Sequence, residues 1–152
     1  MIVVTGAKGQ LGSDVCSILK KHGIEYLGID ADELDITDRK AVDSFFASNQ
    51  TIDSVIHCAA YTAVDKAESD SEKCFLVNET GTENIARCCG DAIKLIYVST
   101  DYVFGSDSDD FLDKEYLYEF YNIIKISKKY FNIYVICIWS YPIKIWFLLF
   151  CL

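Results

Sequence analysis

The sequence is short of positive charge. It contains 14 lysines and arginines against 23 aspartates and glutamates, which gives a formal net charge of −9 at pH 7. Proteins that bind nucleic acids rely on clustered Lys and Arg to displace counterions from the phosphate backbone, so the shortage argues against nucleic acid as a partner. The length of 152 residues leaves room for one domain and hardly for a second.

Zinc-binding patterns and export signals are also missing. The seven cysteines form no C-x-x-C pair and show no Cys/His spacing typical of zinc. Nothing at the amino terminus resembles a signal peptide. We therefore expect reduced thiols in a cytoplasmic protein. His57 and Cys58 fall in an apolar, strand-like run, so we assign them to the core and not to a ligand set.

Glycine and alanine are absent from the chain after Gly105. Glu119 is the single acidic residue from Tyr116 onward. Residue types with A/T-rich codons, such as Ile, Lys, Asn, Tyr and Phe, crowd together there instead. We therefore divide the chain into a folded domain, residues 1–105, and a divergent apolar tail, residues 106–152. One hypothesis is a truncated or frame-shifted tail, which an intact reading frame on resequencing would contradict.

The apolar run from Tyr130 to Leu152 has two further interpretations. A membrane anchor is one, because about 20 apolar residues span a bilayer. Against it, Asn132, Pro142 and Lys144 interrupt the run, and a charge near the centre of a spanning helix costs on the order of 2.5–3.5 kcal/mol. We favour an apolar tail that packs poorly, and we expect poor solubility with homodimers or aggregates, since large exposed apolar patches associate.

Strand-like and helix-like segments alternate in the first domain. Short apolar runs typical of buried strands occupy residues 1–5, 25–30, 54–60 and 94–99. Helical patterns lie between them at residues 10–22, from an N-cap at Asp38 to about Ser48, and over about 71–89. This order predicts an α/β fold, a Rossmann-type doubly wound parallel sheet that is incomplete at its C-terminal side.

A glycine-rich turn, GAKGQLG, joins the first strand to the first helix. Gly6, Gly9 and Gly12 allow the tight turn, the close approach of a pyrophosphate and the packing of helix against strand. N–H groups and the dipole at the start of a helix bind phosphates. No Gly-Lys-Ser/Thr follows, which excludes a P-loop. The turn therefore predicts a dinucleotide cofactor, NAD(P), at the carboxyl ends of the strands.

Two residues give opposite indications of which nicotinamide cofactor binds. Asp30 closes the second strand, near the offset of roughly 20 residues at which an acid accepts hydrogen bonds from the adenosine ribose. This favours NADH. Lys8 lies in the phosphate turn, where a cation could meet the 2′-phosphate of NADPH. The sequence leaves both cofactors open.

Three further stretches give the chain a resemblance to a known family. They read LDITD from Leu34, AAYTAVDKAE from Ala59 and STDYVF from Ser99. Together with the turn, they resemble extended short-chain dehydrogenases/reductases and, among these, the dTDP-4-dehydrorhamnose reductase family, over residues 1 to about 105. The resemblance implies NAD(P)H-dependent reduction of the 4-keto group of dTDP-4-dehydro-L-rhamnose, a sugar-nucleotide substrate, in dTDP-rhamnose biosynthesis.

The resemblance also implies which residues contact the cofactor, and Asn78 matches an asparagine that braces the site. The implied contacts are Gly9, Gln10 and Leu11 at the pyrophosphate, Asp35 and Ile36 at the adenine, and Ala59, Ala60, Tyr61 and Ser99 after the later strands. Magnesium or a dimer contact is implied by analogy alone at a charged cluster that we otherwise interpret as a solvated face. The cluster comprises Asp65, Lys66, Glu68, Asp70 and Glu72.

Reduction of a ketone needs a proton donor, a cation that lowers the pKa of that donor and a hydroxyl that positions the oxygen. Tyr, Lys and Ser/Thr fill these roles in the family. We expect Thr100 to supply the hydroxyl and, with Asp101, to contact the substrate. Tyr121 and Lys125 have the spacing of a catalytic pair on one helix face. The residues around this pair depart from the family pattern, and such a pair arises easily by chance in a Tyr- and Lys-rich segment.

Two functions from different classes stay open. The first is a reductase in a truncated copy with reduced or lost activity. The second is a non-catalytic nucleotide-binding or regulatory protein of the type of the regulatory subunit of methionine adenosyltransferase. Cofactor binding without turnover would favour the second.

Overall fold

A computed structural model describes residues 1–63, 66, 69–100, 133–138 and 145–148 of the chain, with the backbone alone for residue 100 and the last two segments. These residues form one sheet of six strands in the order β2-β1-β3-β4-β5-β6. The strands are β1 Ile2–Thr5, β2 Tyr26–Ile29, β3 Ser54–His57, β4 Lys94–Thr100, β5 Ile133–Ile138 and β6 Ile145–Leu148.

The first five strands of the sheet are parallel, and β6 pairs antiparallel to β5. This confirms the Rossmann-type parallel sheet predicted from the sequence. The chain runs outward from β1 to β2 and then returns to β3 on the other side of β1. The strand order therefore reverses between β1 and β3, and in open parallel sheets ligands bind beyond the carboxyl ends of the strands at such a reversal.

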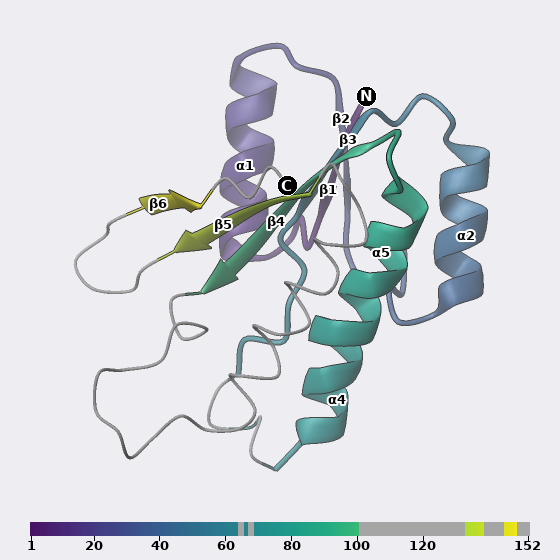
Figure 1. Ribbon diagram of the computed structural model, residues 1–152. Helices are drawn as coiled ribbons and strands as arrows, with labels where there is room; N and C mark the ends of the chain where they lie inside the picture. Colours follow the sequence, from purple (N-terminus) through teal and green to yellow (C-terminus); the bar gives the residue numbers. More distant parts are fainter. Residues whose placement is uncertain (64–65, 67–68, 101–132, 139–144, 149–152) are drawn as a thin grey trace.

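Helices cover both faces of the sheet (Figure 1). Helix α1, Gln10–Lys21, lies on one face, and α2, Arg39–Ser48, and α5, Thr82–Cys89, lie on the other. The predicted long helix is present, but its middle is a π-helical stretch, η1 Leu76–Gly81, between α4 Ser71–Phe75 and α5. Gly23 has a positive φ of 65° just after α1, as a C-terminal glycine should.

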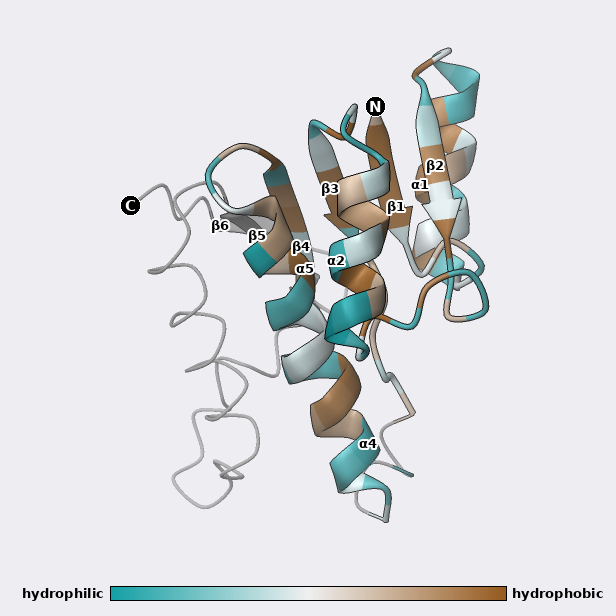
Figure 2. Ribbon diagram, turned by 90° about the vertical axis from the view of Figure 1, so that its right-hand side faces the viewer, coloured by the Kyte–Doolittle hydropathy of each residue, from teal (hydrophilic) through white to brown (hydrophobic). Residues whose placement is uncertain are grey.

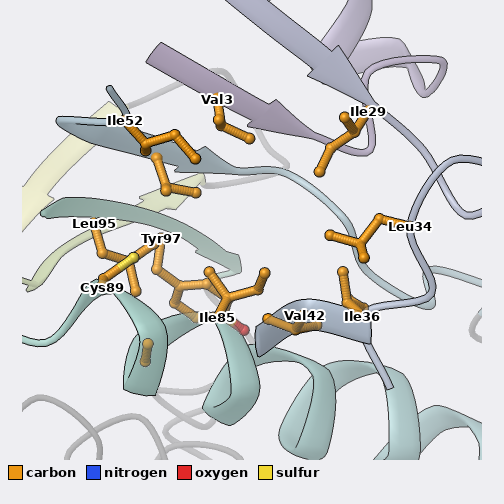
Figure 3. Packing of buried hydrophobic residues seen from close by; sticks show 12 residues of the cluster. Val3, Ile29, Leu34, Ile36, Val42, Ile52, Ile85, Cys89, Leu95 and Tyr97 are labelled. Carbon is orange, nitrogen blue, oxygen red and sulfur yellow. The ribbon is translucent and has the colours of Figure 1, made fainter. Parts of the chain in front are cut away.

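The main core lies between the sheet and the pair α2 and α5. Figure 3 shows Val42 and Ile85 from these helices packed toward the apolar side chains of the strands, and Figure 2 shows the matching hydrophobic colour of β1, β3 and β4. Leu34 and Ile36, from the loop before α2, close one end of the same cluster. This packing holds the carboxyl ends of β1 and β3 in fixed positions, which is where the sequence predicts the cofactor.

Asp38 caps α2 as predicted, because its Oδ1 accepts hydrogen bonds from the backbone N–H groups of Lys40 at 2.8 Å and Ala41 at 3.2 Å. We expect Asp38→Ala to lower the free energy of unfolding by about 1 kcal/mol, the usual effect of losing an N-cap. Asp14→Ala is the matched control, since it removes the same charge from an exposed position inside α1. Urea denaturation measures both, and an equal loss in the two variants would contradict the capping account.

Two segments of the apolar tail belong to the sheet. Residues Ile133 to Ile138 of β5 pair in register with Leu95 to Thr100 of β4. The sequence IYVICI is rich in β-branched residues, as expected of a strand inside a parallel sheet. This strand was not predicted from the sequence, because the unusual composition of the whole tail hides it. Truncation, a shifted frame and association through the tail stay predictions.

No helix within the described residues is long and apolar enough to cross a membrane. The part of the tail that the structure describes forms β5 and β6, which are strands of the sheet. The remainder of the run from Tyr130 to Leu152 lies outside the described residues.

Candidate functional site

The glycine-rich turn packs against the segment that follows β3. Gly6 has a φ of 65°, and a Cβ on it would lie 2.8 Å from both the backbone N and the Cα of Ala59. A Cβ on Gly12 would lie 2.0 Å from the carbonyl oxygen of Gly6. Real Cβ atoms do not approach backbone this closely, so both positions require glycine. The turn and the β3 segment are in contact at the reversal point of the sheet.

Helix α1 begins directly at this turn. Gly9 is its N-cap residue, donates its N–H to the Gly6 carbonyl at 3.0 Å and provides no side-chain cap. The first N–H groups of a helix have no acceptor within the helix, and the dipole places partial positive charge at this end. Gly9 and Gln10 are exposed, and Leu11 is half-buried. The arrangement suits the binding of a pyrophosphate.

Asp30 lies at the end of β2, beside the turn. Its Oδ2 accepts a hydrogen bond from the backbone N–H of Lys8 at 2.9 Å, and its Oδ1 accepts one from Ala31 at 2.8 Å. The structure thus brings together the two residues that gave opposite indications about the cofactor. The side chain of Lys8 contacts the carboxylates of Asp32 and Glu33.

Asp35 and Ile36 follow in the loop before α2. The Oδ1 of Asp35 accepts hydrogen bonds from the Thr37 N–H at 2.9 Å and hydroxyl at 2.7 Å, and these bonds lower the pKa of the Asp35 carboxyl. Ile36 is buried in the core, and its side chain fills the space in which Gly81 of η1 lacks a Cβ. The expected adenine contacts of the two residues stay predictions.

Asn78 anchors the segment that follows β3. Its Oδ1 accepts the backbone N–H of Tyr61 at 2.7 Å, and its Nδ2 donates to the Tyr61 carbonyl at 3.2 Å. Asn78 lies in η1, and short π-helical stretches occur frequently at functional sites. Both backbone bonds of Tyr61 end on one side chain, so Asn78 fixes the course of the chain from Ala59 to Tyr61. This contact is consistent with the bracing role that the resemblance implies.

A buried polar network, which was not predicted from the sequence, lies beneath these residues. His57 Nδ1 lies 2.6 Å from Thr5 Oγ1, and His57 Nε2 lies 3.1 Å from Thr82 Oγ1. The hydroxyl of Thr5 also accepts the N–H of Ala59 at 3.3 Å, and the His57 ring stacks on Tyr97. His57 is fully buried, which lowers its pKa to about 4. The neutral imidazole therefore ties β1 and β3 to α5 just below the site.

The predicted catalytic residues are only partly within the described structure. Thr100 is the last residue of β4, and its backbone pairs with that of Ile138. Ser99 is buried within the same strand. Asp101, Tyr121 and Lys125 lie outside the described residues. The structure therefore places the end of β4 at the same edge as the glycine turn, and it leaves the Tyr-Lys pair a prediction.

Metal and disulfide chemistry is not seen in the part of the chain that the structure describes. No group of three or more His, Cys, Asp or Glu side chains there could hold a metal ion. No disulfide joins the cysteines whose side chains are described, which are Cys16, Cys58, Cys74, Cys88 and Cys89. Burial raises the pKa of the Cys58 thiol to about 11. Asp65 and Glu68 of the charged cluster lie outside the described residues, so magnesium stays untested.

A glycine-rich turn of this kind occurs in several families of nucleotide-binding proteins, and comparison with known proteins shows to which of them the chain belongs. A family model described as the RmlD substrate binding domain matches residues 1–119. The chain belongs to this family. dTDP-4-dehydrorhamnose reductases of Mycobacterium tuberculosis and Mycolicibacterium smegmatis are 43% identical over 107 residues and 44% identical over 111 residues, which are 70% and 72% of this chain. The resemblance inferred from the motifs is confirmed.

A solved structure of an RmlD-family member supports the same assignment. The dTDP-4-dehydrorhamnose reductase of Bacillus anthracis, in complex with NADP, superposes with a TM-score of 0.80 and 26% sequence identity. The match covers 91% of this chain and 52% of that one. The chain spans about a third of the length of the curated relatives, 34% and 33%.

Proposed function

We propose that the chain binds NAD(P)H at the carboxyl ends of β1 and β3 and reduces the 4-keto group of dTDP-4-dehydro-L-rhamnose. The close contact of Gly6 with the backbone of Ala59 carries this proposal. Because Gly6 and Gly9 have no side chains, the turn presents bare backbone beside the start of α1. A pyrophosphate can approach this backbone closely. The Asp30 carboxylate lies next to it, where the adenosine ribose of such a cofactor binds.

The bound cofactor supplies the hydride that is added to the carbonyl carbon of the substrate. In this proposal Tyr121 donates the proton to the carbonyl oxygen. The charge of Lys125 lowers the pKa of the Tyr121 phenol, because a nearby cation favours the phenolate. The hydroxyl of Thr100, at the end of β4, positions the carbonyl oxygen, and Asp101 contacts the sugar nucleotide. The segment from Ala59 to Tyr61, in which Ala59 and Tyr61 are half-buried and Ala60 is exposed, lines the cofactor on the β3 side.

A titration followed by a turnover assay tests this function. We expect NADH or NADPH to bind the purified chain and to be oxidised in the presence of the keto-sugar nucleotide. Tyr121→Phe should keep the cofactor affinity and lower kcat by about 100-fold or more, the usual contribution of a positioned acid. Binding without turnover in the unmodified chain would overturn the reductase and favour the regulatory alternative. The reductase names of the curated relatives favour the enzyme.

Asn78→Ala tests whether the anchored segment after β3 serves the cofactor. The variant removes both hydrogen bonds to the Tyr61 backbone. At about 1 kcal/mol for each bond, we expect the cofactor affinity to fall by up to about 30-fold. Asn49→Ala is the matched control, because it removes a side-chain bond to the Phe45 carbonyl at the end of α2. Fluorescence titration with NADH measures both. Equal affinities in the two variants would show that Asn78 has no role at the site.

A further inference from the structure

The ammonium group of Lys8 lies between two carboxylates of the loop that follows β2. Its Nζ donates hydrogen bonds to Asp32 and to Glu33, with 2.8 Å between Nζ and Glu33 Oε1. The other oxygen of Glu33 accepts the backbone N–H of Asp30 at 2.9 Å, which fixes its carboxylate at the start of the loop. The hydrogen bonds to Asp32 and Glu33 raise the pKa of Lys8. The one cation of the phosphate turn is therefore already paired within the chain.

The carboxylate of Asp30 is held in place while keeping capacity to accept further hydrogen bonds. The backbone N–H groups of Lys8 and Ala31 each bind one of its oxygens. An ionised carboxylate has about four acceptor positions, so ribose hydroxyls can still be bound. In Rossmann domains an acid at the end of this strand accepts from the ribose 2′-hydroxyl, the group that carries the extra phosphate in NADP.

The charge around this position is negative. The carboxylates of Asp32 and Glu33 bind the ammonium of Lys8, and the carboxylate of Asp30 accepts the backbone N–H of the same residue. A phosphate monoester carries about −1.5 to −2 charges at pH 7. Its approach would bring like charges together and would require Lys8 to leave its two partners. A 2′-hydroxyl meets neither obstacle, because it is uncharged and can donate to Asp30.

We propose that residues 30–33 make this chain select NADH over NADPH. Asp30 accepts the ribose hydroxyls, and Asp32 with Glu33 withholds the Lys8 ammonium from a 2′-phosphate. The inference rests on the proposed function, since it concerns the same cofactor site. The Bacillus anthracis relative is in complex with NADP, so the inference concerns these residues of this chain alone.

Titrations of the full chain with NADH and with NADPH test the inference. We expect NADH to bind at least about tenfold more tightly than NADPH at low salt. The double variant Asp32→Asn/Glu33→Gln should strengthen NADPH binding about tenfold and change NADH binding by less than about threefold, because it frees Lys8 and removes two negative charges. Adding Lys8→Met to this variant should reverse most of the gain in NADPH affinity. This result would show that the 2′-phosphate binds the freed lysine, and that the gain does not come only from the loss of repulsion by the two carboxylates.

The matched control is Glu25→Gln/Asp91→Asn. It removes the same charge from two exposed positions at the amino ends of β2 and β4, the opposite edge of the sheet, and should leave both affinities unchanged. Equal binding of NADH and NADPH to the unmodified chain, or no gain for NADPH in the double variant, would overturn the inference alone. Failure of both nucleotides to bind would overturn the proposed function and this inference with it.

Discussion

Gly6→Ala is expected to lower the free energy of unfolding by about 3 kcal/mol and to abolish NAD(P)H binding, whereas Gly23→Ala is expected to lower it by about 1 kcal/mol. The two glycines have the same φ of 65°. An alanine at either position therefore meets the same backbone strain. The comparison isolates the effect of the space around the new Cβ.

That space differs sharply between the two positions. A Cβ at Gly6 would lie 2.8 Å from backbone atoms of Ala59 and 2.9 Å from the carbonyl carbon of Cys58, whereas nothing lies within 4 Å at Gly23. Backbone atoms of a packed strand end cannot move aside cheaply, and overpacking of this kind costs about 1–3 kcal/mol. If the backbone moved to relieve this overlap, the glycine-rich turn would be separated from the segment that follows β3, and the cofactor site would be lost. Urea denaturation and NADH titration measure both effects, and equal stability of the two variants would refute the close approach.

Between pH 6.5 and about 4 the chain is expected to lose about 3 kcal/mol of stability through His57. Burial lowers the pKa of His57 from 6.5 to about 4. In this window the unfolded chain binds a proton that the folded chain does not bind, so stability falls as pH falls, by about 1.4 kcal/mol per pH unit. The stabilising contribution of the neutral His57 is complete above pH 6.5. It is lost as the pH falls toward about 4, the pKa of His57 in the folded chain.

His57→Asn should remove this slope, and His22→Asn should keep it, because His22 is exposed at the end of α1. The carboxyl groups of Asp35, Asp43 and Asp53 have pKa values lowered below 3.8 by their hydrogen bonds. Their stabilising effect is therefore lost mainly below the window, as pH falls through their folded values. Denaturant midpoints measured between pH 7 and 4.5 test the prediction. An unchanged slope in His57→Asn would contradict it.

The elements of the first domain could be predicted because local signals set them. Residues 10–22 show apolar spacing on one helix face, Asp38 is a good N-cap, and each buried strand is a short β-branched run. The glycine turn could be located because three glycines between a strand and a helix serve physical needs that are visible in the sequence. The structure confirms the elements to within a few residues at most boundaries.

Contacts between distant residues could not be predicted in the same way. The pairing of His57 with Thr5 and Thr82 depends on β1, β3 and α5 meeting in space. The only sign of it in the sequence is that Thr5 and His57 are polar residues at the ends of two apolar strands. The pairing of Lys8 with Asp32 and Glu33 depends on how the loop after β2 folds back. The strand Ile133–Ile138 was hidden by the uniform composition of the tail.

Amide hydrogen exchange with and without NADH tests the central claim most directly, because it locates the cofactor along the chain. A pyrophosphate at the reversal point of the sheet should slow exchange of the N–H groups at residues 9–12 and in the segment from Ala59 to Tyr61. The exposed residues at the end of α1, such as Lys21 and His22, should exchange at an unchanged rate. Unchanged exchange at residues 9–12 in the presence of saturating NADH would contradict the account.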